Sequence, residues 1–193
     1  MRFLISLLAS FLFGGSALAQ VFVTGQGGAA ALSNAAAATG SPPSASNYDS
    51  KVGNSFNAAV GYHYSDWVSF EAGYIWNRNR IISSEVTGSN FRQFNQNLSQ
   101  HAVSGEFMVY FRPRSSHIRP YLSAGPAWIR LSNEDKVGFR TAVGIDLMIG
   151  SGWGIRYSFA EMMSANPFAA GLRPPAQAKL MNFQNLFGFV KVF

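Results

Sequence analysis

Residues 179–193 read KLMNFQNLFGFVKVF and end on an aromatic carboxy-terminal residue. In a β-strand, alternate residues share a face. The phenylalanines of this stretch all fall at odd positions and so share one face: Phe183, Phe187, Phe189 and Phe193. The opposite face carries mainly amides and glycine: Asn182, Gln184, Gly188 and Val190. This arrangement favours a strand with lipid on one side and a filled polar interior on the other. For this segment alone, a core strand of a soluble β-sandwich is the alternative.

The composition narrows the class of protein. The chain has 193 residues, of which 48% are hydrophobic, enough for one domain with a substantial core. Only 12% are charged, roughly half the average of soluble domains, whereas 15% are aromatic. No run of 18 apolar residues offers a transmembrane helix. There is no cysteine, so stability must come from closure of a sheet rather than from disulfides.

The amino-terminal residues 1–19 have the parts of a secretory signal peptide. Arg2 supplies the positive charge, residues 3–13 the apolar run, and Ala17-Leu18-Ala19 the small residues of a cleavage site. We therefore predict cleavage before Gln20 and a mature domain over residues 20–193. A membrane anchor is the alternative, but the apolar run is too short to span a bilayer.

The net charge of +6 and a pI near 9.9 would be compatible with binding to nucleic acid, which is negatively charged. The basic residues are scattered along the chain, except for Arg112, Arg114 and Arg119 around one turn. No basic stripe is interleaved with aromatic residues. An exported chain also rarely meets nucleic acid, and we predict no nucleic-acid partner.

The mature chain divides into eight segments with period-two patterning, which we predict to be strands. They lie near residues 21–26, 56–64, 70–76, 103–111, 119–131, 138–149, 155–159 and 179–193. Polar stretches at 32–50 and 82–97, and a proline-containing stretch after 159, read as long loops. Tight turns are predicted at 65–67, 112–118 and 150–152. Pro126 lacks an amide hydrogen, so we expect a bulge near Gly125-Pro126 that leaves the facing of this strand undecided.

The alternation of short turns and longer loops is typical of a transmembrane β-barrel. The predicted fold is therefore an all-β, eight-stranded, antiparallel up-and-down barrel, with both termini on the periplasmic side of the outer membrane. A soluble lipocalin-like barrel also has eight strands, but its apolar face would point inward around a ligand.

Charged residues fall on the predicted inward face, opposite the aromatic side chains. They are Glu71, Glu106, Arg140, Asp146 and Arg156. The turn at 150–152 places Asp146 directly opposite Arg156 if residue 149 opposes residue 153. We predict that these residues form an ion-pair network that plugs the lumen, with His63 near its lower end. A gate or proton path is the alternative interpretation.

Three stretches resemble the small bacterial outer-membrane β-barrels of the OmpA and OmpX type: YHYSDWVSFEAGY (62–74), RPYLSAGPAWIR (119–130) and LFGFVKVF (186–193). The resemblance implies insertion by the outer-membrane assembly machinery, which recognises a last strand ending in an aromatic residue. Gly188 and Phe193 match that pattern, whereas Lys191 stands where the family usually has an apolar residue. We expect outer-membrane lipids as partners, lipopolysaccharide or a host surface as the contact of the loop residues Arg78, Arg80 and Arg92, and a monomer.

We found no pattern that predicts catalysis, a cofactor or a metal. Outer-membrane lipid A deacylases use a His-x-Ser pair, which His63-Tyr64-Ser65 matches in spelling, but at a predicted periplasmic turn. His101 and Ser104 would face opposite sides of a strand. Three separate histidines and no cysteines give no metal-ligand spacing. We therefore predict a structural or interaction role with the surface loops as a contact surface, and keep a lipid-modifying enzyme and a narrow channel as alternatives.

Overall fold

The computed structural model describes residues 20–33, 36–40, 44–131, 134–165, 174 and 179–193. The predicted signal peptide at 1–19 lies outside the described residues and stays a prediction. The described part of the chain contains no helix with the length and apolarity to cross a membrane. Its regular elements are strands: β1 Gln20–Leu32, β2 Ala36–Gly40, β3 Ser44–His63, β4 Val68–Thr87, β5 Asn90–Tyr110, β6 Ile118–Leu131, β7 Glu134–Gly150, β8 Trp153–Ala165 and β9 Lys179–Val192.

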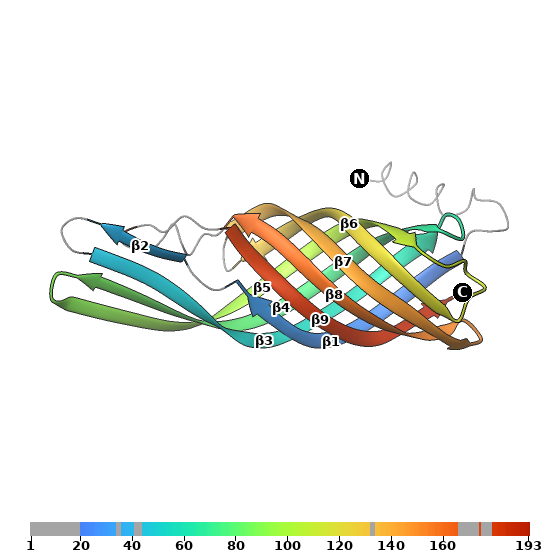
Figure 1. Ribbon diagram of the computed structural model, residues 1–193, viewed down its shortest axis with the longest axis horizontal. Helices are drawn as coiled ribbons and strands as arrows, with labels where there is room; N and C mark the ends of the chain where they lie inside the picture. Colours follow the sequence, from blue (N-terminus) through green and yellow to red (C-terminus); the bar gives the residue numbers. More distant parts are fainter. Residues whose placement is uncertain (1–19, 34–35, 41–43, 132–133, 166–173, 175–178) are drawn as a thin grey trace, which may run out of the picture.

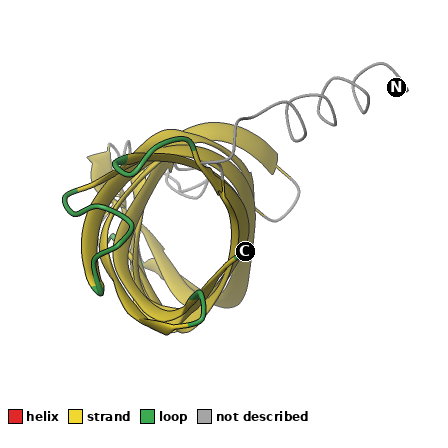
Figure 2. Ribbon diagram, turned by 90° about the vertical axis from the view of Figure 1, so that its right-hand side faces the viewer, coloured by secondary structure: helices red, strands yellow, loops and turns green. Residues whose placement is uncertain are grey.

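The strands form one antiparallel sheet that closes on itself (Figures 1 and 2). Around the ring the order is β1-β9-β8-β7-β6-β5-β4-β3, and β3 returns to pair with β1. The closing seam joins β1 to β9 from Phe22↔Val192 to Leu32↔Asn182. The short β2 lies outside the ring and pairs with the outer part of β3. The predicted eight-stranded up-and-down barrel is confirmed.

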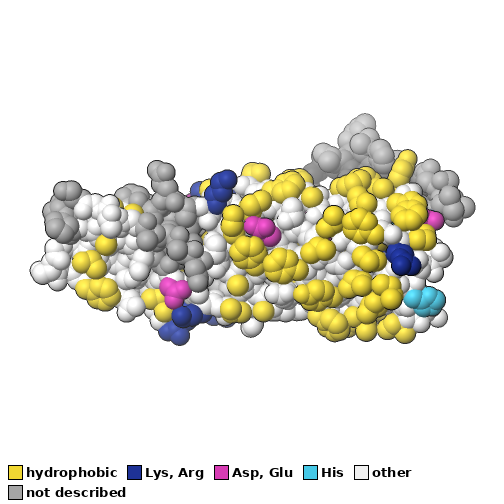
Figure 3. Space-filling view, viewed as in Figure 1, with side chains coloured by type: hydrophobic (Ala, Val, Ile, Leu, Met, Phe, Trp, Pro, Cys, Tyr) yellow, Lys and Arg dark blue, Asp and Glu magenta, His cyan; other side chains and the backbone are white. Residues whose placement is uncertain are grey.

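The alternation of inward and outward residues agrees with the sequence pattern. On β9, Phe187 and Phe189 are 61% and 63% exposed, whereas Asn182 and Gln184 are fully buried. The same parity holds along β7, where Val143 is exposed and Ala142 is buried. Figure 3 shows hydrophobic side chains gathered over the barrel part of the molecule. The apolar face therefore points outward, opposite to a soluble barrel with a lipophilic interior.

Three short turns lie at one end of the barrel, which we call the turn end: 64–67, 111–117 and 151–152. Gln20 and Phe193, the two ends of the described mature chain, line one pocket there. The last of these turns has positive φ at three consecutive residues, Gly150 (138°), Ser151 (51°) and Gly152 (74°). Two glycines make this conformation accessible, because they have no Cβ to clash with the backbone.

The opposite end carries an extended sheet that we call the paddle, formed by residues 36–40, 44–51, 80–87 and 90–99 (Figure 1). The predictions of long loops at 32–50 and 82–97 were wrong, because the described residues of these stretches are mainly in strands. The strands β4 and β5 pair without a break out to Thr87↔Asn90, so only the two-residue turn Gly88-Ser89 joins them. A strand exposed on both faces has no apolar alternation, and so the usual sequence signal is missing.

The expected bulge at Gly125-Pro126 is also wrong. The register of β6 against β7 is constant through Gly125↔Arg140 and Pro126↔Phe139. On the other side, pairing with β5 lapses between Ser104↔Ala127 and Phe107↔Ala124 without any change of register. Because the pairing of β6 with β5 lapses at Pro126, its missing amide hydrogen leaves no gap in a hydrogen-bonded ladder there, and no bulge is needed. The ring of Pro126 is exposed on the outward face. At Gly125 the backbones of β6 and β5 approach each other closely, since a Cβ there would lie 1.8 Å from the Gly105 carbonyl oxygen.

Candidate functional site: the filled lumen and the paddle

The centre of the lumen is occupied by a bridging arginine. Arg156 and Asp146 are direct register partners on β8 and β7. Arg156 donates from Nε to Asp146 Oδ1 (2.6 Å) and from Nη2 to Oδ2 (2.9 Å), and from Nη1 to Glu71 Oε2 (2.6 Å). The three residues are at most 7% exposed. One guanidinium therefore holds two carboxylates in a water-poor interior, where charge-assisted hydrogen bonds are strong.

A second ion pair lies beside the first. Arg140 donates from Nη1 to Glu106 Oε1, and both side chains are buried. Ser104 and Ser123 donate to the two Glu106 oxygens at 2.8 and 2.7 Å. Glu106 is the register partner of Glu71, so the two pairs are neighbours in the lumen. The structure thus brings together all five inward charges proposed from the sequence, as two adjacent groups.

Polar and apolar layers fill the rest of the interior. A belt of amides centres on Gln100, whose Oε1 accepts hydrogen bonds from Asn77 (3.2 Å) and Asn182 (2.5 Å). A buried apolar cluster also lies inside, formed by Leu32, Ile75, Ile81, Leu98, Ala102, Ala127, Ile129, Leu131, Met162 and Leu180. The sequence pattern predicts a polar lumen, and this cluster was not predicted. The sequence feature that could have revealed it is an apolar residue at a position that faces inward by strand alternation, such as Ile75 between the outward-facing Tyr74 and Trp76.

The His-x-Ser pair of the enzyme alternative is not assembled. The Ser65 hydroxyl accepts hydrogen bonds from the backbone N–H groups of Trp67 and Val68 (3.2 and 3.0 Å), and so belongs to the turn. His63 points into the lumen, where its Nδ1 lies 2.5 Å from the Ser69 hydroxyl oxygen. The buried Nε2 atom has no hydrogen-bond partner among the described residues. A carboxylate that would orient the histidine, as in a catalytic triad, is thus not in contact with it.

The second histidine–serine pair is separated by the sheet. His101 faces outward and its Nδ1 lies 2.6 Å from the Tyr74 hydroxyl, whereas Ser104 faces the lumen. In the part of the chain that the structure describes, no group of three or more metal-ligating side chains could hold an ion. The described side chains therefore offer neither a nucleophile–base pair with an orienting acid nor a metal centre.

From the sequence, Arg119 is only part of a basic turn, because the pattern leaves the facing of its strand undecided. The structure places it inside the barrel, 2% exposed, with its guanidinium 4.0 Å from the centroid of the Tyr110 ring. Tyr110 also donates a hydrogen bond from its hydroxyl to Asp146 Oδ2 (3.1 Å). A buried cation thus lies between the ion network and the turn end.

The tip of the β6–β7 hairpin, where β7 extends beyond its pairing with β8 at Phe139↔Met163, carries an exposed ion pair. Arg130 donates from Nε and Nη2 to the two oxygens of Asp135 at 2.8 and 3.1 Å. The hydrogen bond from this guanidinium lowers the pKa of Asp135 below its usual range, because it stabilises the ionised carboxylate.

The paddle presents an open strand edge. Within residues 90–97 of β5 every side chain is exposed, including Phe91 (63%) and Phe94 (49%). This segment pairs with β4 on one side only, since the pairing of β5 with β6 begins at Gln100↔Leu131. No described strand pairs with the other side. Among the described residues, its backbone groups on that side have no strand partner, and such an edge can pair with a further strand.

Known proteins of similar fold are small outer-membrane barrels. None of the curated protein sequences matches the chain. Among solved structures, Neisserial surface protein A is 14% identical with a TM-score of 0.60, and covers 90% of this chain and 97% of its own. The outer membrane protein OprG from Pseudomonas aeruginosa is 12% identical with a TM-score of 0.63, covering 93% and 98%. The amino-terminal β-barrel domain of OprF from the same organism is 12% identical with a TM-score of 0.54, covering 90% and 97%. The family model for the outer membrane protein β-barrel domain matches residues 5–185. The chain therefore belongs to the outer membrane protein β-barrel family.

Proposed function

We propose that the protein is a plugged barrel that anchors the paddle in the outer membrane and presents it as a contact surface for extended polypeptide segments. The lumen contains buried ion pairs, an amide belt and an apolar cluster. An eight-stranded barrel has an interior just wide enough for side chains. The filled interior supports a structural role for the barrel rather than transport through it.

The proposed orientation places the turn end in the periplasm and the paddle outside the cell, because barrels of this class have short turns on the periplasmic side. In this orientation the outward aromatic side chains meet outer-membrane lipids, and exposed paddle arginines such as Arg80 and Arg92 lie near lipopolysaccharide. Gly188 and Phe193 remain the proposed recognition signal for the assembly machinery. The barrel is proposed to act as a monomer.

The observation that carries the interaction role is the open edge of β5. An extended peptide can add a strand to such an edge, with backbone hydrogen bonds supplying affinity and alternate side chains supplying specificity. Phe91 and Phe94 are large exposed anchors on this strand. Arg92 and the amides around it keep the strand polar enough to remain soluble outside the membrane.

The test uses a synthetic peptide with the sequence of residues 80–87, because this segment of β4 already pairs with β5 along its other edge. We expect the peptide to bind the protein in detergent micelles and to slow hydrogen exchange of backbone amides in residues 90–99. A peptide of the same composition with proline in the middle is the control, since proline cannot complete a strand ladder. Unchanged exchange at every amide of this segment would contradict the proposal.

Two further measurements separate the alternatives. A plugged barrel should give no steady ion conductance in planar bilayers, whereas a narrow channel should conduct. The proposed role is non-catalytic. It is supported by the contacts of the two residues, since His63 lies beside the Ser69 hydroxyl and the Ser65 hydroxyl accepts a hydrogen bond from the backbone of its own turn. A lipid-modifying enzyme would instead release acyl chains from lipopolysaccharide, and Ser65→Ala would abolish the release.

A further inference from the structure

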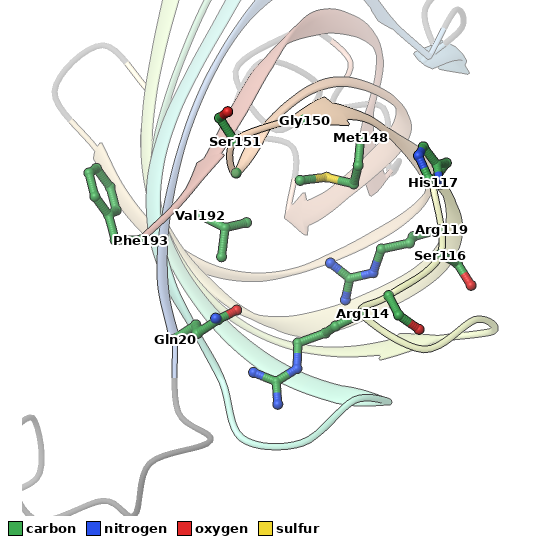
Figure 4. Close-up of a pocket in the computed structure, with 12 residues that line it drawn as sticks. Gln20, Arg114, Ser116, His117, Arg119, Met148, Gly150, Ser151, Val192 and Phe193 are labelled. Atoms are coloured by element: carbon green, nitrogen blue, oxygen red, sulfur yellow. The ribbon is translucent and has the colours of Figure 1, made fainter.

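The lumen opens at the turn end into a cavity of about 420 Å³. Its wall combines the turn at 111–117 with the start of β6, the β7–β8 turn and the two ends of the described mature chain. Arg114 and Arg119 point into this space from one side (Figure 4), and His117 lines it as well. Among the described residues, no aspartate or glutamate lines the cavity. The side chains that line the cavity therefore contribute positive charge, and the acidic partner of Arg114, Asp66, is not among the lining residues.

Arg119 is buried and incompletely paired. Its Nε and Nη2 atoms have no hydrogen-bond partner among the described residues. Its register partner on β7 is Asp146, but Arg156 and the Tyr110 hydroxyl take the oxygens of that carboxylate. The guanidinium is left against the Tyr110 ring. Burial of charged donors without a partner is unfavourable, so these two atoms mark a position where an acceptor would bind.

The two unpaired atoms form the side edge of the guanidinium, with parallel N–H donors that match two oxygens of an oxoanion. The same lumen shows this mode of binding, because Nε and Nη2 of Arg156 hold both oxygens of Asp146. Arg114 brings a second positive charge, which it shares with Asp66 through a 2.8 Å ion pair. A phosphate group, which is anionic and presents several oxygens at once, suits a space lined by two arginines.

We propose that the cavity at the turn end binds a phosphate group, with the Nε–Nη2 edge of Arg119 as the principal donor and Arg114 beside it. The residues that line the cavity surround the mouth of the lumen rather than the lipid-facing surface. A free phosphate ion or a soluble phosphate ester therefore has direct access, and the headgroup of a phospholipid is the other source of the same chemistry.

The experiment measures thermal unfolding of the protein in zwitterionic detergent, with increasing inorganic phosphate against sodium chloride of equal ionic strength. A ligand that binds the folded state raises the unfolding temperature in a saturable manner. Arg119→Lys keeps the charge but loses the paired donors, so the apparent phosphate affinity should fall by about tenfold or more. Arg112→Gln is the matched control, because Arg112 is an exposed arginine of the same turn that does not line the cavity.

A stabilisation by phosphate that is present and equal in wild type and Arg119→Lys would overturn the proposal. If Arg119→Lys does not fold, Arg114→Gln at a partly exposed turn position replaces it, and an unchanged response there would overturn the proposal in the same way. A second arm, in buffer without inorganic phosphate, compares nanodiscs of phosphatidylcholine, whose headgroup phosphate is neutralised by choline, with nanodiscs containing phosphatidylglycerol, whose headgroup carries a net negative charge. Stabilisation by phosphatidylglycerol that depends on Arg119 or Arg114, without an effect of inorganic phosphate, assigns the group to a lipid headgroup. No stabilisation in either arm would also overturn the site.

Discussion

The coupling between Asp146 and Arg156 can be measured in a double-mutant cycle. Asp146→Ala removes the acceptors of two charge-assisted hydrogen bonds from Arg156 and of a third from Tyr110, but leaves Arg156 bonded to Glu71. At about 1.5 kcal/mol for each bond, the two bonds from Arg156 account for a loss of about 3 kcal/mol of unfolding free energy. Arg156→Ala leaves two buried carboxylates without their guanidinium, so it belongs at the upper end of the range for a broken buried pair, about 5 kcal/mol.

The double variant should cost about as much as Arg156→Ala alone, because Asp146 has lost its main partner in either case. The coupling energy is then about 3 kcal/mol, within the range found for residues in one network. The assay is reversible unfolding by guanidinium in lipid vesicles, followed by tryptophan fluorescence. The same cycle on the exposed pair Arg130 and Asp135 is the control, and its coupling should be close to the error of the measurement.

A coupling between Asp146 and Arg156 within about 0.5 kcal/mol of zero would refute the reasoning, because independent sites add within that margin. In that case water must screen the charges, or the register at the glycine turn must differ from the observed Asp146↔Arg156 pairing. Asp146→Asn separates these explanations. It keeps an acceptor for Arg156 in place and should cost less than Asp146→Ala if the two side chains meet.

Three further predictions concern the membrane face and the hairpin tip. Because the outward face is apolar, the folded protein should require detergent or lipid, and its gel mobility should change on heating; a folded monomer soluble in plain buffer would contradict the barrel. Val143→Arg, at a 50% exposed outward position near the middle of β7, should cost about 2–4 kcal/mol in lipid. The inward neighbour Ala142→Ser should cost much less, and a reversed order in the unfolding assay would show that the assigned faces are wrong. Arg130→Gln should raise the pKa of Asp135 back to its usual range, because the hydrogen bond that lowers it is lost. The titration of this carboxyl can be followed by NMR, and an unchanged titration would show that the pair does not form in solution.

The barrel was predictable from the sequence because the membrane imposes one rule on every spanning strand. Outward residues must be apolar, and so the parity of Phe187 and Phe189, or of Val143 and its neighbours, specifies both the strand and its face. The predicted pairing of Asp146 with Arg156 is confirmed. The predicted turn geometry was wrong in detail, because Gly150 rather than residue 149 opposes Trp153 and the register shifts between Met148 and Gly150.

The paddle, the proline and the buried Arg119 were not predictable by the same argument. Outside the bilayer, a strand such as 90–97 is exposed on both faces and need not alternate. The accommodation of Pro126 depends on where the ladder between β5 and β6 lapses, which is a property of two strands together. Uncertainty at this proline left the facing of its strand open, and with it the position of Arg119.

The seam between β1 and β9 sets the order in which the barrel can be completed. Phe22 pairs with Val192, so the first strand of the ring to be synthesised must wait for the last. Contacts at such a sequence separation form slowly, since a long loop must close before they contribute. Until then both strands keep a free edge, a known route to aggregation. Removal of residues 188–193 is therefore expected to stop biogenesis at an open sheet, rather than to give a slightly weakened barrel.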